Sequence, residues 1–150
     1  MSITDLFSLK GRIALVTGAR RGIGRAIATL FAEAGADIAV CDINVEDGEL
    51  NSVVETIVNS GRRGLAVQAD VSKNEQVLAM VDKVQTELGP LDILVNNAFF
   101  SDMSSLSNFD DYWARAIDVN LNGCKICSLA VSDGMIERKK GNIINIASVA

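Results

Sequence analysis

The chain has 150 residues, 49% hydrophobic and 22% charged, a balance typical of one folded domain rather than a disordered segment. Its net charge of −5 excludes nucleic acid as a main partner, because phosphate binding needs a basic surface. The sequence contains no histidine, which excludes serine–histidine and cysteine–histidine catalysis and removes the commonest zinc ligand. We therefore predict no metal site.

Nothing in the sequence indicates secretion or membrane insertion. Residues 1–12 lack the apolar core of a signal peptide, and no later stretch is long and apolar enough to span a bilayer. Cys41, Cys124 and Cys127 without a secretory signal fit a reducing compartment, which predicts a cytoplasmic protein with no membrane partner. Cys124 and Cys127 are expected to be packing residues of one helix, since no second cysteine pair completes a zinc site.

Five short apolar segments divide the chain. They are rich in Val and Ile and apolar at successive positions, the pattern of strands covered on both faces of a parallel sheet. They are RIALVT (12–17), DIAVCD (37–42), GLAVQAD (64–70), LDILVNN (91–97) and NIINIAS (142–148).

Helical patterns occupy the intervals between these strands. The first follows the glycines after residue 17, and the second places an apolar stripe on 50–58 before Gly61. Ser72 and Glu75 have capping-box spacing, which predicts that Ser72 caps a third helix, and a longer helix is expected over 108–138. This alternation predicts one α/β domain over 1–150, a doubly wound Rossmann-type parallel sheet of strand order 3-2-1-4-5.

The first strand runs directly into the glycine-rich stretch TGARRGIG (17–24). In a turn between a strand and a helix, glycines let the backbone approach a pyrophosphate, and the helix dipole favours its charge. Gly18, Gly22 and Gly24 are spaced GxxxGxG rather than GxGxxG, so the generic dinucleotide fingerprint is not matched literally. The setting nevertheless predicts a dinucleotide-binding loop.

Acidic residues end the second and third strands. Asp42 is placed to accept hydrogen bonds from an adenosine ribose, and it would repel a 2′-phosphate, which favours NAD over NADP. Arg20 and Arg21 favour NADP instead, because a loop guanidinium can pair with a 2′-phosphate. The alternative interpretation is that they are pyrophosphate neighbours or solvent-exposed loop charges. Asp70 could accept the adenine amino group with Val71 beside the ring, or simply precede the third helix.

Four motifs in order resemble the short-chain dehydrogenase/reductase family. They are TGARRGIG (17–24), LVNNA (94–98), DVNL (118–121) and NIINIAS (142–148), and the resemblance covers essentially the whole chain. It implies that Gly18, Gly22, Ile23 and Gly24 hold the pyrophosphate, Asp42 the ribose, Asp70 and Val71 the adenine, and that Asn97 and Ala98 lie near the nicotinamide ribose. It further implies that Asn120 supports a proton-relay water and that Ser148 hydrogen-bonds the substrate oxygen.

Two departures from the family pattern stand out. Phe99 replaces the glycine of the family's N-N-A-G segment, so it either lines the substrate entrance or perturbs nicotinamide placement. The family's catalytic Y-x-x-x-K pair is missing, because the only tyrosine is Tyr112 and Ala116 follows four positions later. We therefore expect an N-terminal portion that is cut after the fifth strand and is inactive by itself.

The resemblance thus implies an NAD(P)-dependent oxidoreductase, with NAD favoured over NADP. Its substrate would be a small alcohol or ketone, and the full-length form is expected to be a homo-oligomer. Alternatives are an NADPH-dependent 3-oxoacyl reductase and a non-catalytic dinucleotide-binding module. A methyltransferase with a related sheet shares the glycine loop but has no use for NNA, VNL and a strand-end serine together.

Overall fold

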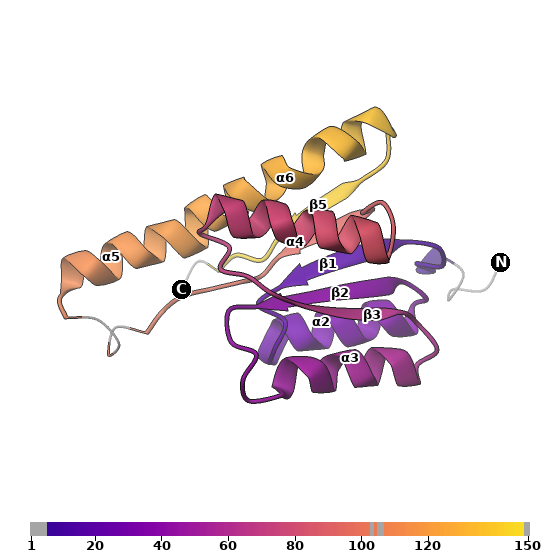
Figure 1. Cartoon of the computed structure of the whole chain (residues 1–150), viewed down its shortest axis with the longest axis horizontal. Helices are drawn as coiled ribbons and strands as arrows, with labels where there is room; N and C mark the ends of the chain where they lie inside the picture. Colours follow the sequence, from indigo (N-terminus) through magenta and orange to yellow (C-terminus); the bar gives the residue numbers. More distant parts are fainter. Residues whose placement is uncertain (1–5, 103, 105–106, 149–150) are drawn as a thin grey trace.

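The computed structural model describes residues 6–102, 104 and 107–148. Five parallel strands form one sheet in the order β3-β2-β1-β4-β5 (Figure 1). They are β1 (Ile13–Thr17), β2 (Asp37–Asp42), β3 (Gly64–Gln68), β4 (Ile93–Asn96) and β5 (Asn142–Asn145). The predicted α/β class and strand order are confirmed.

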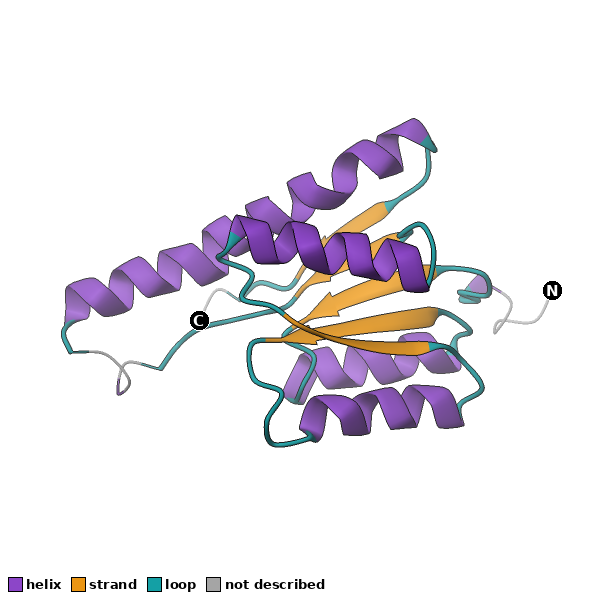
Figure 2. Cartoon of the chain, viewed as in Figure 1, coloured by secondary structure: helices purple, strands orange, loops and turns teal. Residues whose placement is uncertain are grey.

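Helices cover both faces of this sheet, as expected for a doubly wound fold (Figure 2). On one face lie α2 (Gly22–Glu33) and α3 (Glu49–Asn59). On the other lie α4 (Asn74–Glu87) and α6 (Cys124–Glu137). α6 ends a long helical run that begins with α5 (Phe109–Ile117) and the π-helical segment η2 (Asp118–Gly123), and α5 extends beyond the sheet (Figure 1). The long helix predicted over 108–138 is therefore present, with a widened turn in its middle.

Successive side chains of the central strands enter two separate cores. Leu15 packs with the residues of α4 and α6, whereas Val16 packs with those of α2 and α3. Both side chains are fully buried. The prediction that strands are covered on both faces is wrong for β5, where Ile143 and Ile144 are 39% and 40% exposed. No helix in the described ranges is long and apolar enough to cross a membrane.

The capping role predicted for Ser72 is wrong. Lys73 precedes α4, and the helix start has no side-chain cap. The Ser72 hydroxyl instead donates to Asp70 Oδ1 at 2.7 Å and accepts from Arg115 Nη1 at 2.7 Å. Charged partners make stronger hydrogen bonds than a backbone N–H does, and Arg115 arrives from α5, far away in the sequence.

A buried carboxylate, Asp37, joins the start of β2 to the turn before β3. It accepts from Arg62 Nη2 at 2.8 Å, Arg63 Nε at 2.8 Å and the Arg63 backbone N–H at 3.0 Å. Burial by itself raises the pKa of Asp37, but the hydrogen bonds from Arg63 and Arg62 and the charge of Arg62 outweigh it, so its pKa lies below the ordinary value.

We expect Asp37→Asn to lower the free energy of unfolding by about 2 kcal/mol at pH 7, because two guanidinium groups lose their charged acceptor. A folded-state pKa below the unfolded value stabilises the fold above the unfolded pKa, and this stabilisation is lost as the pH falls through the folded pKa. The difference from wild type, measured by urea unfolding, should therefore shrink below about pH 4. Glu87→Gln is the control, since its pair with Lys83 is 3.9 Å long and half-exposed, and it should cost less than about 1 kcal/mol at either pH. Equal losses of unfolding free energy at pH 7 in the two variants would contradict the stabilising role of the Asp37 carboxylate.

Candidate functional site

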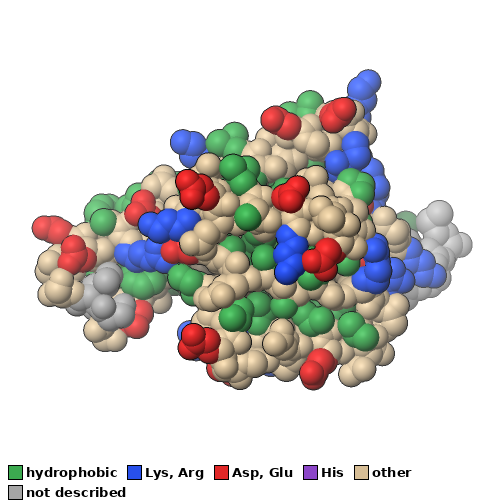
Figure 3. All heavy atoms as spheres, viewed as in Figure 1, with side chains coloured by type: hydrophobic (Ala, Val, Ile, Leu, Met, Phe, Trp, Pro, Cys, Tyr) green, Lys and Arg blue, Asp and Glu red, His purple; other side chains and the backbone are tan. Residues whose placement is uncertain are grey.

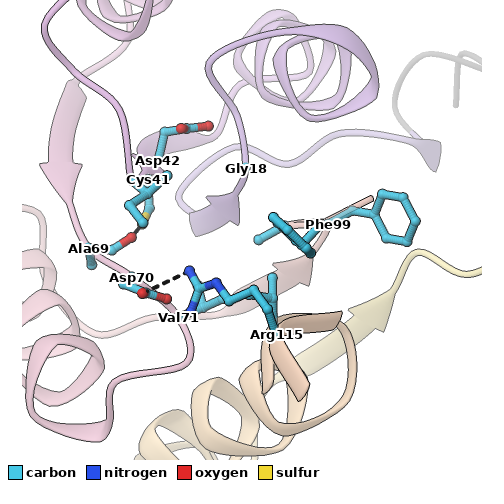
Figure 4. A pocket seen from close by; sticks show the side chains of 12 residues that line it. Gly18, Cys41, Asp42, Ala69, Asp70, Val71, Phe99 and Arg115 are labelled. Carbon is cyan, nitrogen blue, oxygen red and sulfur yellow. Dashed lines mark hydrogen bonds and ion pairs between the residues drawn. The ribbon is translucent and has the colours of Figure 1, made fainter. Parts of the chain in front are cut away.

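A cavity of about 110 Å³ opens at the carboxyl edge of the sheet (Figure 4). At this edge the chain order reverses between β1 and β4, the place where doubly wound proteins bind their ligands. The loops after four strands and the helical run beyond them line it: Gly18, Cys41, Asp42, Ile43, Ala69, Asp70, Val71, Ala98, Phe99, Phe100, Arg115 and Val119.

The glycine loop lies at this edge of the sheet, where its Gly18 lines the cavity. Gly18 and Gly22 have φ of +63° and +57°, which L side chains rarely adopt. A Cβ on Gly18 would lie 2.7 Å from Ala98 Cα, and one on Gly24 would lie 2.4 Å from Gly18 O, whereas one on Gly22 would meet nothing within 4 Å. Gly18 and Gly24 are therefore needed for close packing, while Gly22 borders open space.

The start of α2 is suited to an anion. The helix begins at Gly22, and Arg21 before it makes no side-chain capping bond. Among the described residues, no side chain caps its first N–H groups, a condition under which a helix start attracts negative charge. Ile23 is 63% exposed beside them, and Arg21 is also exposed.

Asn97 and Thr17 fasten the loop after β4 to the glycine loop. Thr17 Oγ1 accepts hydrogen bonds from the N–H groups of Asn97 and Ala98 at 3.0 and 3.1 Å, and it donates one to Val95 O at 3.3 Å. The Asn97 amide nitrogen donates to Thr17 O and Gly18 O, both at 3.0 Å. Asn97 thus supports the loop that Gly18 belongs to, a role that the motif comparison did not reveal.

Arg20 is enclosed by acids. Its Nε lies 3.6 Å from Asp42 Oδ1, its Nη1 bonds to Asp47, and Glu49 Oε2 is 3.9 Å from Nη1. Its side chain is only 15% exposed, so the interpretation of Arg20 as a solvent-exposed charge is wrong. Asp42 also accepts from the backbone N–H of Asn44 at 3.1 Å. Asp47 and Glu49 were missed, because only the folded loop brings them to Arg20.

Asp70 is held from two sides. Ser72 donates to its Oδ1 through N–H and hydroxyl at 3.0 and 2.7 Å, and Arg115 Nη2 donates to its Oδ2 at 2.9 Å. Burial raises the pKa of Asp70, but the hydrogen bonds from Ser72 and the hydrogen bond and charge of Arg115 outweigh it, so the pKa lies below its ordinary value. The carboxylate is therefore ionised and remains an acceptor at neutral pH. Val71 beside it is buried.

Asn120 lies in the π-helical segment, where such insertions often mark functional sites. Its side-chain Oδ1 accepts from Phe100 N at 2.8 Å, and its Nδ2 donates to Phe100 O at 3.0 Å. Ser148 follows β5 and is exposed. Neither Asn120 nor Ser148 is among the residues that line the cavity, whereas Gly18, Asp42, Asp70, Val71 and Ala98 line it together.

Phe99 lines the cavity but is 72% exposed, and its ring points away from the labelled residues (Figure 4). This position favours the interpretation that it borders an entrance. The thiol of Cys41, although part of the cavity wall, is buried, and burial raises its pKa. Burial likewise raises the pKa of Cys127 to about 12, so both thiols stay protonated and serve as packing groups.

A doubly wound nucleotide-binding architecture is defined by a parallel sheet, a helix start suited to an anion and carboxylates at the carboxyl edge of the sheet, here Asp42 at the end of β2 and Asp70 in the loop after β3. The model of the short chain dehydrogenase family matches residues 12–150. The chain therefore belongs to this family of oxidoreductases, which bind a nicotinamide dinucleotide.

Similar proteins carry different activities. The 5-keto-D-gluconate 5-reductase of Escherichia coli K12 is 36% identical over 98% of the chain and 58% of that protein. A 3-oxoacyl-[acyl-carrier-protein] reductase of Staphylococcus epidermidis is 39% identical over 91% of the chain and 56% of that protein. The chain thus spans just over half the length of these relatives.

Solved structures agree with the fold. A short-chain type dehydrogenase/reductase from Mycobacterium marinum has a TM-score of 0.87 at 36% identity, covering 99% of the chain and 60% of that protein. A 3-oxoacyl-[acyl-carrier protein] reductase from Brucella melitensis with bound NAD has a TM-score of 0.84 at 34% identity, covering 99% and 59%. The resemblance drawn from the four sequence motifs is confirmed.

Proposed function

We propose that residues 1–150 form the dinucleotide-binding part of an oxidoreductase that acts on a small alcohol or ketone, with NAD as the preferred cofactor. The proposal rests on one arrangement. Gly22 borders open space at a helix start without a side-chain cap, and it belongs to the same glycine loop as Gly18. Gly18 lines the cavity together with Asp42 and Asp70. A pyrophosphate bound by Gly18, Gly22, Ile23 and Gly24 would thus have acceptors for ribose and adenine beside it.

The charges around Arg20 support NAD over NADP. Its guanidinium already faces Asp42, Asp47 and Glu49, so the three carboxylates outnumber the single cation. A 2′-phosphate near Asp42 would be repelled by this excess of negative charge, whereas a ribose hydroxyl would donate a hydrogen bond to the Asp42 carboxylate. Arg20 Nε is buried without a hydrogen-bond partner among the described residues, and a hydroxyl bound at Asp42 would offer it an acceptor. Arg21, which is exposed, is proposed as a pyrophosphate neighbour.

Asn120 and Ser148 are the proposed catalytic groups of the complete enzyme. A bound nicotinamide supplies the hydride donor or acceptor. Ser148 would hydrogen-bond the substrate oxygen, and Asn120, held by the Phe100 backbone, would fix a proton-relay water. The sequence lacks the family's Y-x-x-x-K pair, so the chain alone is proposed to bind dinucleotide without turning over substrate.

A 3-oxoacyl reductase is the second candidate. The observation that favours it is the 39% identity to the Staphylococcus epidermidis reductase, together with the Brucella melitensis structure. We propose this candidate in an NADPH-dependent form, so tighter binding of NADPH than of NADH would favour it; because the Brucella melitensis reductase holds NAD, binding of NAD alone does not exclude it. A non-catalytic dinucleotide-binding module shares every feature of the cavity and differs only in activity.

The surface supports a homo-oligomer and a cytoplasmic location for the complete protein. Exposed apolar side chains follow the long helical run: Phe109, Trp113, Leu121, Leu129 and Ile136. Such a stripe is typical of a surface that packs against another helix. On the face shown in Figure 3, acidic and basic side chains lie interspersed. All three cysteines are free thiols, which fits a reducing compartment.

Calorimetric titration of the chain tests the proposal. We expect saturable binding of NAD⁺, weaker binding of NADP⁺ and no binding of nicotinamide mononucleotide alone. The residues proposed for the adenosine half, Asp42, Asp70 and Val71, all line the cavity, whereas Asn120 and Ser148 do not. Incubation with NADH and a panel of ketones should leave the absorbance at the reduced nicotinamide band unchanged. Failure of both dinucleotides to bind at millimolar concentration would overturn the proposed function.

A further inference from the structure

Arg115 reaches from α5 to the loop after β3, across the edge of the cavity (Figure 4). Its two terminal nitrogens are used separately: Nη2 donates to Asp70 at 2.9 Å and Nη1 to Ser72 at 2.7 Å. The side chain is 26% exposed, so solvent weakens this ion pair only in part. Asp70 is the acceptor proposed for adenine, so Arg115 would share this carboxylate with a bound ligand.

Arg115 also contacts the segment that holds Asn120. Its guanidinium carbon lies 5.9 Å from the centre of the Phe100 ring, within the range of a cation–π contact. The Phe100 backbone makes both hydrogen bonds to the Asn120 side chain. A continuous set of contacts thus runs from Asp70 through Arg115 and Phe100 to Asn120.

The helix that carries Arg115 is weakly anchored elsewhere. No residue of α5 is buried, and the helix passes directly into the π-helical segment with Asn120. Its contacts with the loops around the cavity include the hydrogen bonds of Arg115 and the ring of Tyr112, whose centre lies 5.9 Å from that of Phe100. Because no residue of α5 is buried, local motion of this helix costs less free energy than motion of a buried element would.

We propose that Arg115 is a positioning residue that transmits occupancy of the adenine end of the cavity to Asn120. This inference rests on the proposed function. A ligand amino group that donates to Asp70 competes with Arg115 for the same carboxylate. The guanidinium then shifts relative to the Phe100 ring, and the Phe100 backbone carries the shift to the Asn120 amide. The reaction end of the crevice thereby responds to the nucleotide end.

Side-chain amide resonances of Asn120 provide the test, measured by NMR on the 150-residue chain with ¹⁵N-labelled asparagine. The probe is adenosine monophosphate; nicotinamide mononucleotide, which is not expected to bind, is the negative control and should leave the resonances in place. At saturating adenosine monophosphate, the Asn120 resonances of wild type should move, and in Arg115→Met most of this movement should be lost. Arg115→Lys keeps the charge and one hydrogen bond, so it should restore part of the movement. Measuring at saturation separates the effect from any change in affinity.

Lys125→Met is the matched control, because Lys125 is an exposed cation further along the same helical run. It should respond as wild type does. Movement of the Asn120 resonances in Arg115→Met equal to that of wild type would overturn the role of Arg115, and so would saturation of wild type without movement. Fluorescence of the single tryptophan, Trp113 on α5, checks that each variant is folded. Absence of any nucleotide binding would instead refute the proposed function, and this inference with it.

Discussion

Gly24→Ala is expected to abolish dinucleotide binding and to lower the free energy of unfolding by about 3 kcal/mol. The added Cβ would lie 2.4 Å from Gly18 O, 2.5 Å from Asn97 Nδ2 and 2.9 Å from Ala19 Cα. Two of these atoms belong to the backbone, and the third is the amide nitrogen that joins Asn97 to the loop, so none can move without breaking the hydrogen bonds between Asn97 and the glycine loop. Urea unfolding measures the first effect and calorimetric titration with NAD⁺ the second.

Two other glycines separate strain from binding. Gly22 and Gly61 have φ of +57° and +80°, and a Cβ on either would meet nothing within 4 Å. Alanine at each should cost about 1 kcal/mol of unfolding free energy through backbone strain alone. Only Gly22→Ala should weaken NAD⁺ binding, by about tenfold, because only Gly22 borders the proposed pyrophosphate site. A Gly24→Ala protein as stable as these two would contradict the close packing at Gly24.

The elements that local chemistry defines were predictable from the sequence. Continuous apolar runs identified all five strands, and the glycine turn and Asp42 followed from their positions at strand ends. The carboxyl ends of all strands in a parallel sheet lie at one edge, so a residue at such an end can be placed at that edge from the sequence. The placement of Gly18, Asp42 and Asp70 around one cavity agrees with this reasoning.

Residues that act through tertiary contacts were not predictable in this way. Arg115 lies on a helix 45 positions from Asp70, and no local pattern joins them. Arg115 also donates a hydrogen bond to Ser72, which does not take the capping role that its spacing to Glu75 indicated. β5 carries the apolar pattern of a covered strand, yet its side chains are exposed. The apolar pattern of a strand indicates that it suits a buried position, but its actual exposure depends on the elements that pack against it.

The acidic enclosure of Arg20 leads to a different expectation from Asp42 alone. If Asp42 alone set the cofactor preference, its removal would weaken the binding of NAD⁺ and completely reverse the preference in favour of NADP⁺. Asp47 and Glu49 remain beside Arg20 in Asp42→Ala, so the guanidinium is still neutralised and is not released to a 2′-phosphate. A complete change of preference should therefore need a second substitution.

We expect Asp42→Ala to weaken NAD⁺ binding by about 2 kcal/mol, roughly 30-fold, because the ribose hydroxyls lose a charged acceptor. NADP⁺ affinity should rise modestly in this variant and more strongly in Asp42→Ala/Asp47→Asn, where Arg20 loses two of its three acidic partners and can pair with the phosphate. Calorimetric titration of both dinucleotides measures the ratio. Glu46→Gln removes an exposed acid from the same loop and serves as the control, with the wild-type ratio retained. Tighter binding of NADP⁺ than of NAD⁺ by wild type would refute the cofactor preference, and a single Asp42→Ala change that completely reverses the ratio would show that Asp47 and Glu49 do not restrain Arg20.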